Sequence, residues 1–149
     1  PVNEGNVQSW AGLCARLWPE AGAETMLGAL AEHGPSCWPG MEGENFLYCL
    51  DGEPVGFINL SLRRDFVNGA RSSPTAYIEG IYVTEESRGR GIGRELIRHA
   101  KLWALGRGCT DLASDALLEN TGSRGFHARA GFEEAERVVC FVMRLDGAL

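Results

Sequence analysis

The sequence has little lysine, little positive charge and no long apolar run. Thirteen of its 14 basic residues are arginine, so only Lys101 could supply lysine-based phosphate or Schiff-base chemistry. The 20 acidic residues give a formal net charge of −6, which disfavours a general binder of nucleic acid or anionic membrane and favours a cationic ligand. No apolar run approaches the roughly 20 residues that cross a bilayer. We therefore expect a soluble cytoplasmic protein with no nucleic-acid or membrane partner.

The cysteines lack the spacing of a zinc site or a disulfide framework. They are odd in number, lie far apart and include no CxxC pair. We therefore expect buried apolar thiols in a reducing compartment, and no bound metal. The five are Cys14, Cys37, Cys49, Cys109 and Cys140.

The length and the periodicity predict one α/β domain over residues 1–149. Apolar residues at three- and four-residue spacing predict helices over 6–17, 22–33, 92–105 and 119–130. Runs of β-branched and aromatic residues predict strands over 46–50, 55–62, 76–83, 110–114 and 138–143. This order predicts a central mixed, largely antiparallel sheet with helices on both faces, and parallel pairing where the helix over 92–105 joins two strands.

The most informative segment is the glycine-rich turn Arg88-Gly89-Arg90-Gly91-Ile92-Gly93-Arg94, which lies between a predicted strand and a predicted helix. Its glycines allow successive N–H groups to face one anion at the positive end of the helix, and its arginines add charge there. This pattern predicts a pyrophosphate cradle. A nucleotide P-loop would need GxxxxGK[ST] and a dinucleotide fingerprint GxGxxG, and neither spacing is present.

An arginine followed by x-x-Gly-x-Gly, after the apolar strand that ends in residues 81–83, resembles the acetyl-CoA loop of the GCN5-related N-acetyltransferase (GNAT) superfamily. The downstream Asn120 and the pair Gly131-Phe132 fit the same family. The resemblance implies a GNAT fold in which a strand splays at a bulge, frees its amides for pantetheine, and leads into the pyrophosphate loop. The residues that it assigns to acetyl-CoA are Ile81, Tyr82, Val83, Arg88, Gly89, Arg90, Gly91, Ile92, Gly93, Arg94 and Asn120.

A second resemblance covers nearly the whole chain in order. The blocks Arg16-Leu17-Trp18-Pro19, Phe66-Val67-Asn68-Gly69 and Ala113-Ser114-Asp115 are similar to those of one bacterial subgroup of aminoglycoside 6′-N-acetyltransferases, and so is the stretch 131–139. The resemblance implies transfer of acetyl from acetyl-CoA to the 6′-amine of aminoglycoside antibiotics, by direct attack in a ternary complex, and hence antibiotic resistance. It also implies a homodimer built through the C-terminal region.

Two acids are the candidate catalytic residues. Glu79 lies inside an otherwise apolar strand and Asp115 follows the next short strand, so both would face the acetyl group if those strands are neighbours. A polycationic acceptor calls for carboxylates in a partly desolvated cleft. Its amine must lose a proton before attack, to Glu79, to Asp115 or to an intervening water. A solvent-facing strand acid and a helix cap are the alternative roles of the two residues.

The subgroup resemblance adds further substrate contacts. Trp18 and Phe66 match aromatic walls that stack on sugar rings, although Trp18 could equally belong to the core and Phe66 replaces a tyrosine. Glu136 matches a substrate acid, or forms only an exposed pair with Arg137. His127 stands where many superfamily members carry the tyrosine that protonates the leaving thiolate, and it could do so or lie on a helix surface.

Two other functions remain open at this point. An acetyltransferase for another small polyamine would need the same loop and acids, and a panel of acceptors would separate it. A non-catalytic acyl-CoA sensor would bind CoA without turnover, which the Glu79/Asp115 pair argues against. The predicted last strand, 138–143, is apolar on both faces, which suits pairing across a subunit boundary.

Overall fold

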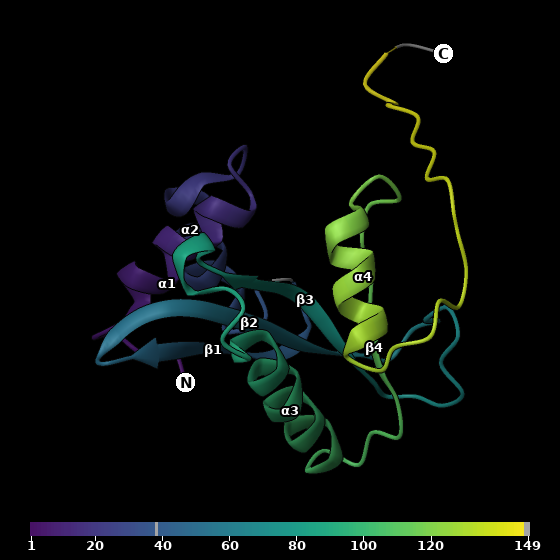
Figure 1. The fold of residues 1–149 in the computed structure, drawn as a ribbon. Helices are drawn as coiled ribbons and strands as arrows, with labels where there is room; N and C mark the ends of the chain where they lie inside the picture. The colour runs from purple at the N-terminus through teal and green to yellow at the C-terminus, as the bar shows by residue number, and fades with distance from the viewer. Residues whose placement is uncertain (38, 148–149) are drawn as a thin grey trace. The chain divides into compact units, whose positions relative to one another are not determined.

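The computed structural model describes residues 1–37 and 39–147 (Figure 1). The chain divides into two compact units after Asp115. The elements are α1 (Val7–Leu17), α2 (Gly22–His33), β1 (Glu42–Leu50), β2 (Glu53–Arg63), β3 (Thr75–Val83), η1 (Glu85–Ser87), α3 (Ile92–Leu105), β4 (Leu112–Ser114) and α4 (Thr121–Arg129). All four predicted helices are confirmed to within two residues. No helix of the described chain is long and apolar enough to cross a membrane.

The first unit contains a four-stranded sheet in the order β1-β2-β3-β4. β1 and β2 form an antiparallel hairpin, and Asp51 and Gly52 at its turn have φ values of 51° and 84°, as a tight hairpin requires. β2 and β3 are also antiparallel, whereas β3 and β4 are parallel and are joined through α3. The predicted mixed, largely antiparallel sheet is confirmed.

Helices cover both faces of this sheet (Figure 1). Consecutive side chains of β1 point to opposite faces of the sheet. Leu47 packs against a buried cluster built mainly from α1, while the ring of Phe46 lies 4.3 Å from that of His99 on α3. On the face covered by α1, the buried indole of Trp10 donates a hydrogen bond of 2.8 Å to Asn59. The sheet is thereby held between α1 and α3, which fixes the positions of the ends of its strands.

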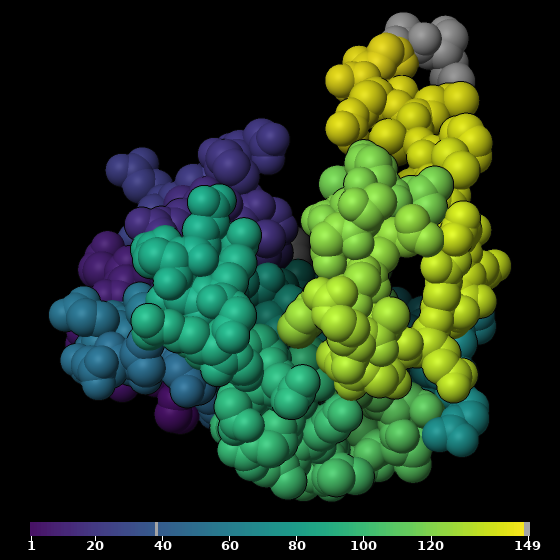
Figure 2. All heavy atoms as spheres, in the orientation of Figure 1, coloured from purple at the N-terminus to yellow at the C-terminus, as the bar shows by residue number. Residues whose placement is uncertain are grey.

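The second unit consists of α4 and an extended C-terminal segment. The predicted strand over 138–143 is wrong, because residues 132–146 form neither helix nor strand. A strand exists only when its backbone bonds to a neighbour, and within the described chain this segment has no such partner. Its apolar side chains therefore stay open to solvent, from 63% exposed at Val138 to 92% at Phe141. Figure 2 shows the segment in yellow as an extended stretch of chain.

The cysteines divide into two groups. Cys14, Cys37 and Cys109 are buried, as predicted, and burial raises the pKa of Cys14 to about 12. Cys49 and Cys140 are exposed, so the expectation of five buried thiols is wrong for these two. Cys49 lies at an irregularity in the β1–β2 pairing, and Cys140 lies in the extended C-terminal segment.

Candidate active site

The strand β3 carries a bulge at Glu79. Asn59 of β2 pairs with Gly80 and the next residue, Leu60, pairs with Ile78, so Glu79 has no partner residue on β2. An extra residue of this kind bends a strand and turns its side chain in a new direction. The bulge that the family resemblance implies is therefore present, and it coincides with the acid predicted to act in catalysis.

The other edge of β3 opens at the same place. Pairing with β4 runs from Ala76↔Leu112 to Ile78↔Ser114 and then stops. Over residues 79–83 the described chain supplies no β4 partner, so alternate backbone groups of this stretch face an open edge. This stretch includes Ile81, Tyr82 and Val83, the residues predicted to bond pantetheine.

The loop 88–94 leads from this edge into α3. Gly89 and Gly91 have φ values of 77° and 80°, the left-handed region that other residues avoid, and Gly91 is the N-cap of α3. No side chain of the described chain caps this helix, which leaves the N–H groups of its first turn for an anion. Gly93 lies inside that first turn. Because the Ile92 side chain is buried, only the backbone N–H of this residue is available to a ligand.

The loop arginines have different surroundings. Arg90, just before α3, and Arg94, in its first turn, are both exposed. Arg88 instead turns back toward β3, where its Nε donates a hydrogen bond of 2.9 Å to the carbonyl of Val83 and its guanidinium lies over the ring of Tyr82. Arg88 therefore also holds the loop against the end of the strand.

Glu79 is almost fully buried and is bound by two side chains of β2. The exposed fraction of its side chain is 8%. Its Oε1 accepts hydrogen bonds from the hydroxyl of Ser61, at 2.5 Å, and from Nε of Arg63, at 3.0 Å. Its Oε2 accepts one from Nη2 of Arg63, at 2.8 Å. The alternative of a solvent-facing strand acid therefore does not hold for Glu79.

Arg63 also packs against Tyr77 and lies within the electrostatic influence of Asp115. Its guanidinium carbon lies 3.5 Å from the centroid of the Tyr77 ring. Burial raises the pKa of Tyr77 well above its ordinary value, and the negative charge of Asp115 raises it further. Burial opposes the charge of Arg63, but hydrogen bonding and attraction to Glu79 outweigh this and raise its pKa.

These contacts bring the two predicted acids into one group. We call Ser61, Arg63, Tyr77, Glu79 and Asp115 the acid network. Its two carboxylates were predicted from the sequence, and Ser61, Arg63 and Tyr77 were not. A signal for two of them was present: Ser61 and Arg63 alternate with Leu60 and Leu62, which places both polar side chains on one face of the strand.

Trp18 lies beside the acid network and also belongs to the core. It is half-buried at the C-terminal end of α1, and its ring centroid is 6.1 Å from that of Phe57. Its six-membered ring covers the α-carbon of Gly80, the residue after Glu79. The position of Trp18 is therefore compatible both with packing in the core and with stacking on a sugar ring.

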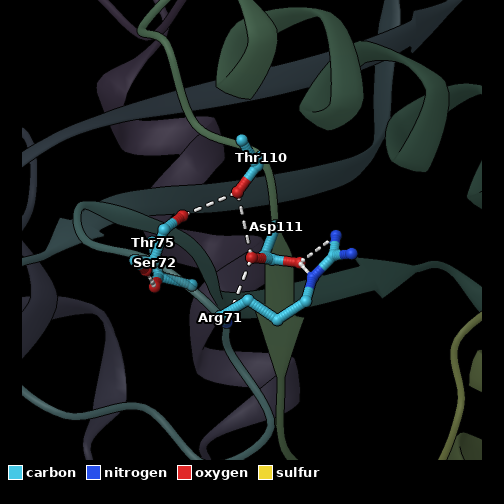
Figure 3. Close-up of polar contacts among 5 residues, drawn as sticks. All are labelled: Arg71, Ser72, Thr75, Thr110 and Asp111. Carbon is cyan, nitrogen blue, oxygen red and sulfur yellow. Dashed lines mark hydrogen bonds and ion pairs between the residues drawn. The ribbon is translucent and has the colours of Figure 1, made fainter.

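Phe66 lies on the loop 64–74 between β2 and β3 and is 85% exposed. The loop is anchored to the chain just before β4 (Figure 3). Arg71 binds the Asp111 carboxylate through its backbone N–H, at 3.2 Å, and through its guanidinium, at 3.0 Å. The hydroxyls of Ser72 and Thr110 lie 2.6 Å apart. The Arg71 guanidinium holds the pKa of Asp111 below its ordinary value.

Three predicted residues lie in the second unit. The Asn120 side chain caps α4 by accepting a hydrogen bond of 3.0 Å from the N–H of Ser123. His127 donates from Nδ1 to the carbonyl of Ser123 at 2.8 Å, and Arg137 pairs with Glu134. Glu136 is exposed. The roles of Asn120, His127 and Glu136 toward ligands remain predictions.

Comparison with known proteins gives consistent matches. A model of the acetyltransferase (GNAT) family matches residues 8–132. An aminoglycoside N(6′)-acetyltransferase type 1 of Stenotrophomonas maltophilia is 42% identical over 141 residues, which is 93% of this chain and 87% of that protein. A protein of the same name from Salmonella enteritidis is 36% identical over 143 residues, 96% of each chain. The structure of AAC(6′)-Iy in complex with the bisubstrate analogue CoA-S-monomethyl-acetylneamine matches with a TM-score of 0.87 and 36% identity, over 96% of this chain and 95% of that one.

Proposed function

The chain belongs to the acetyltransferase (GNAT) family, and we propose that it transfers acetyl from acetyl-CoA to the 6′-amine of aminoglycosides. It is an acetyl-CoA-dependent N-acetyltransferase. The observation that supports the acceptor most strongly is the similarity, over 93% or more of this chain, to enzymes named for that reaction. In a bacterium exposed to these antibiotics, the reaction confers resistance.

Acetyl-CoA binds along the open edge of β3 and at the N-terminus of α3. The pyrophosphate meets the amides of the loop 88–94 and the arginines Arg90 and Arg94. The free backbone groups of residues 81–83 bond the pantetheine. A strand N–H beside the bulge meets the thioester oxygen, where negative charge develops during attack.

The acceptor is held by carboxylates. Glu79 and Asp115 bind and orient its ammonium groups, and Trp18 and Phe66 extend the site over the sugar rings. The amine loses a proton to Asp115, directly or through a water, and its nitrogen attacks the thioester carbon. The C–S bond then breaks, the amide forms, and CoA leaves as a thiolate that takes up a proton. Both substrates are held together, so the rate enhancement comes from position rather than from a covalent acyl-enzyme.

The remaining parts of the proposal concern assembly. We propose that residues 1–149 act as one cytoplasmic domain and that two copies pair through the C-terminal segment. Support comes from the row of exposed apolar side chains there, which includes Val139, Phe141 and Met143. Light scattering of the purified protein tests this: a dimer that becomes a monomer after Val139→Asp and Phe141→Asp supports the pairing, and an unchanged mass contradicts it.

A panel of acceptors tests the proposed substrate. Release of free CoA thiol is measured with kanamycin, tobramycin, spermidine and a lysine peptide, each offered separately. Turnover with the drugs that carry a 6′-amine, and loss of turnover with matched drugs that carry a hydroxyl there, supports the proposal. Turnover with spermidine alone would identify a polyamine acetyltransferase. Binding of CoA without any turnover would identify an acyl-CoA sensor.

A further inference from the structure

We propose that Arg63 is a positioning residue of the acceptor site, which fixes the Glu79 carboxylate so that a single acceptor position points at the incoming amine. Arg63 itself does not touch the reacting atoms. It acts through Glu79. This inference rests on the proposed function, because that function gives Glu79 and Asp115 their role toward the acceptor.

The hydrogen bonds that Glu79 already accepts limit how many more its carboxylate can accept. A carboxylate offers about four lone-pair positions, two on each oxygen. Ser61 and Nε of Arg63 occupy both positions on Oε1, and Nη2 of Arg63 occupies one on Oε2. One position on Oε2 is left. Since only 8% of the side chain is exposed, Glu79 presents one directed acceptor rather than a diffuse negative surface.

Arg63 can hold this geometry because it is fixed on two sides. Its planar fork matches the two oxygens of Glu79, and its face lies 3.5 Å from the centroid of the Tyr77 ring. A change at Arg63 therefore releases Glu79 and uncovers one face of the Tyr77 ring.

The charges of the acid network fit an ammonium group. Two carboxylates and one guanidinium carry a net formal charge of −1, with Glu79 buried and Asp115 exposed. Arg63 thus compensates one of the two negative charges, while the network keeps an attraction for one cation. Lysine would keep the charge but lose the fork, since an ammonium is a compact point charge.

The test compares Arg63→Lys and Arg63→Ala with the unmodified protein in steady-state kinetics, with aminoglycoside and acetyl-CoA varied in turn. A small misplacement of reacting groups can cost on the order of a hundredfold in rate. We expect kcat to fall at least about tenfold in both variants, while the KM for acetyl-CoA changes less than about twofold. Guanidinium ion at low concentration should restore kcat of Arg63→Ala, and methylammonium should not, because only guanidinium reproduces the fork.

Two controls separate positioning from general damage. Arg98→Gln removes an exposed arginine that pairs with Glu95 on α3, and we expect no change in kcat. Thermal unfolding and CoA binding show whether each variant is folded. Equal kcat for Arg63→Lys and the unmodified protein overturns the role of Arg63, and so does a loss in Arg63→Ala that guanidinium does not restore.

The same measurements keep this inference distinct from the proposed function. If the unmodified protein acetylates only polyamines, the proposed acceptor is wrong, but a loss of kcat in Arg63→Lys with spermidine still supports the positioning role. If it acetylates aminoglycosides and Arg63→Lys does so equally well, only the positioning role is overturned. If it acetylates no amine, both fail.

Discussion

The indole of Trp18 covers the α-carbon of Gly80, one residue after the bulge at Glu79. A Cβ atom added to Gly80 would lie only 2.8 Å from Cζ2 of Trp18 and 3.3 Å from Cδ2 of Leu17. The C-terminal end of α1 can therefore sit directly on β3 only because this residue is glycine. The contact joins the hydrophobic core to the acceptor side of the proposed site.

Gly80→Ala should destabilise the protein and slow its reaction. Overpacking a close contact costs typically 1–3 kcal/mol, and the displaced ring lies beside Glu79. We expect the free energy of unfolding in urea to fall by about 2 kcal/mol and kcat to fall with it. Gly28→Ala is the matched control, since Gly28 lies inside α2 with open space around its α-carbon, and it should be neutral or stabilising. Equal effects of the two substitutions would contradict the contact.

The arginines at the start of α3 should act on acetyl-CoA and not on the acceptor. Loss of two charge-assisted phosphate contacts in the double variant Arg90→Gln, Arg94→Gln should raise the KM for acetyl-CoA about tenfold. At saturating acetyl-CoA, kcat should stay unchanged. Added salt should raise this KM more in the unmodified protein than in the variant, because salt screens the contacts that the variant lacks. An increase confined to the KM of the acceptor would contradict the assignment of this loop.

Tyr77 should ionise at a higher pH than an ordinary tyrosine. Burial and the negative charge of Asp115 raise its pKa above the ordinary value of 10.0 and favour the neutral phenol in the folded state. The resulting stabilisation is complete below pH 10 and is lost as the pH rises through the folded-state pKa. Ultraviolet titration of tyrosinate should show a late step that Tyr77→Phe removes and that Asp115→Asn moves to lower pH. A titration of the unmodified protein without a late step that Tyr77→Phe removes would contradict this.

The ion pair between Arg71 and Asp111 should hold the loop 64–74 in place. The pair keeps the pKa of Asp111 below its ordinary value of 3.8, so the anchor is present at neutral pH and is lost as the pH falls through the folded-state pKa. At neutral pH, Asp111→Asn should speed tryptic cleavage within the loop several-fold and raise the KM of the acceptor. Asp65→Asn, which changes the same charge at an exposed position of the loop, should do neither. Equal cleavage rates in both variants would contradict the anchor.

Much of the fold could be predicted from the sequence, because local patterns determine it. The apolar stripe of α3, the Asp51-Gly52 turn and the β-branched run of β3 each specify one element without help from the rest of the chain. The strand over 138–143 could not be decided in this way, since its alternation is typical of a strand but its existence depends on a partner backbone. The exposure of Cys49 also depends on a pairing irregularity that no local pattern encodes.

The candidate site was predictable in part. The loop 88–94 is continuous in sequence, so its glycines and arginines could be identified together. The acid network is assembled from β2, β3 and the end of β4, and its contacts follow from the bulge at Glu79. A bulge shifts the register by one residue, which sequence alternation alone does not reveal, and the pairing of Arg63 with Glu79 was missed for that reason.

The proposed 6′-acetylation is tested by locating the transferred acetyl group on the product. The protein is incubated with acetyl-CoA carrying a ¹³C-labelled carbonyl and with tobramycin, and the product is analysed by two-dimensional NMR. We predict one acetyl group, attached to the 6′-nitrogen, with a matching amount of free CoA thiol. An acetyl group on any other nitrogen, or release of CoA without an acetylated drug, would contradict the account.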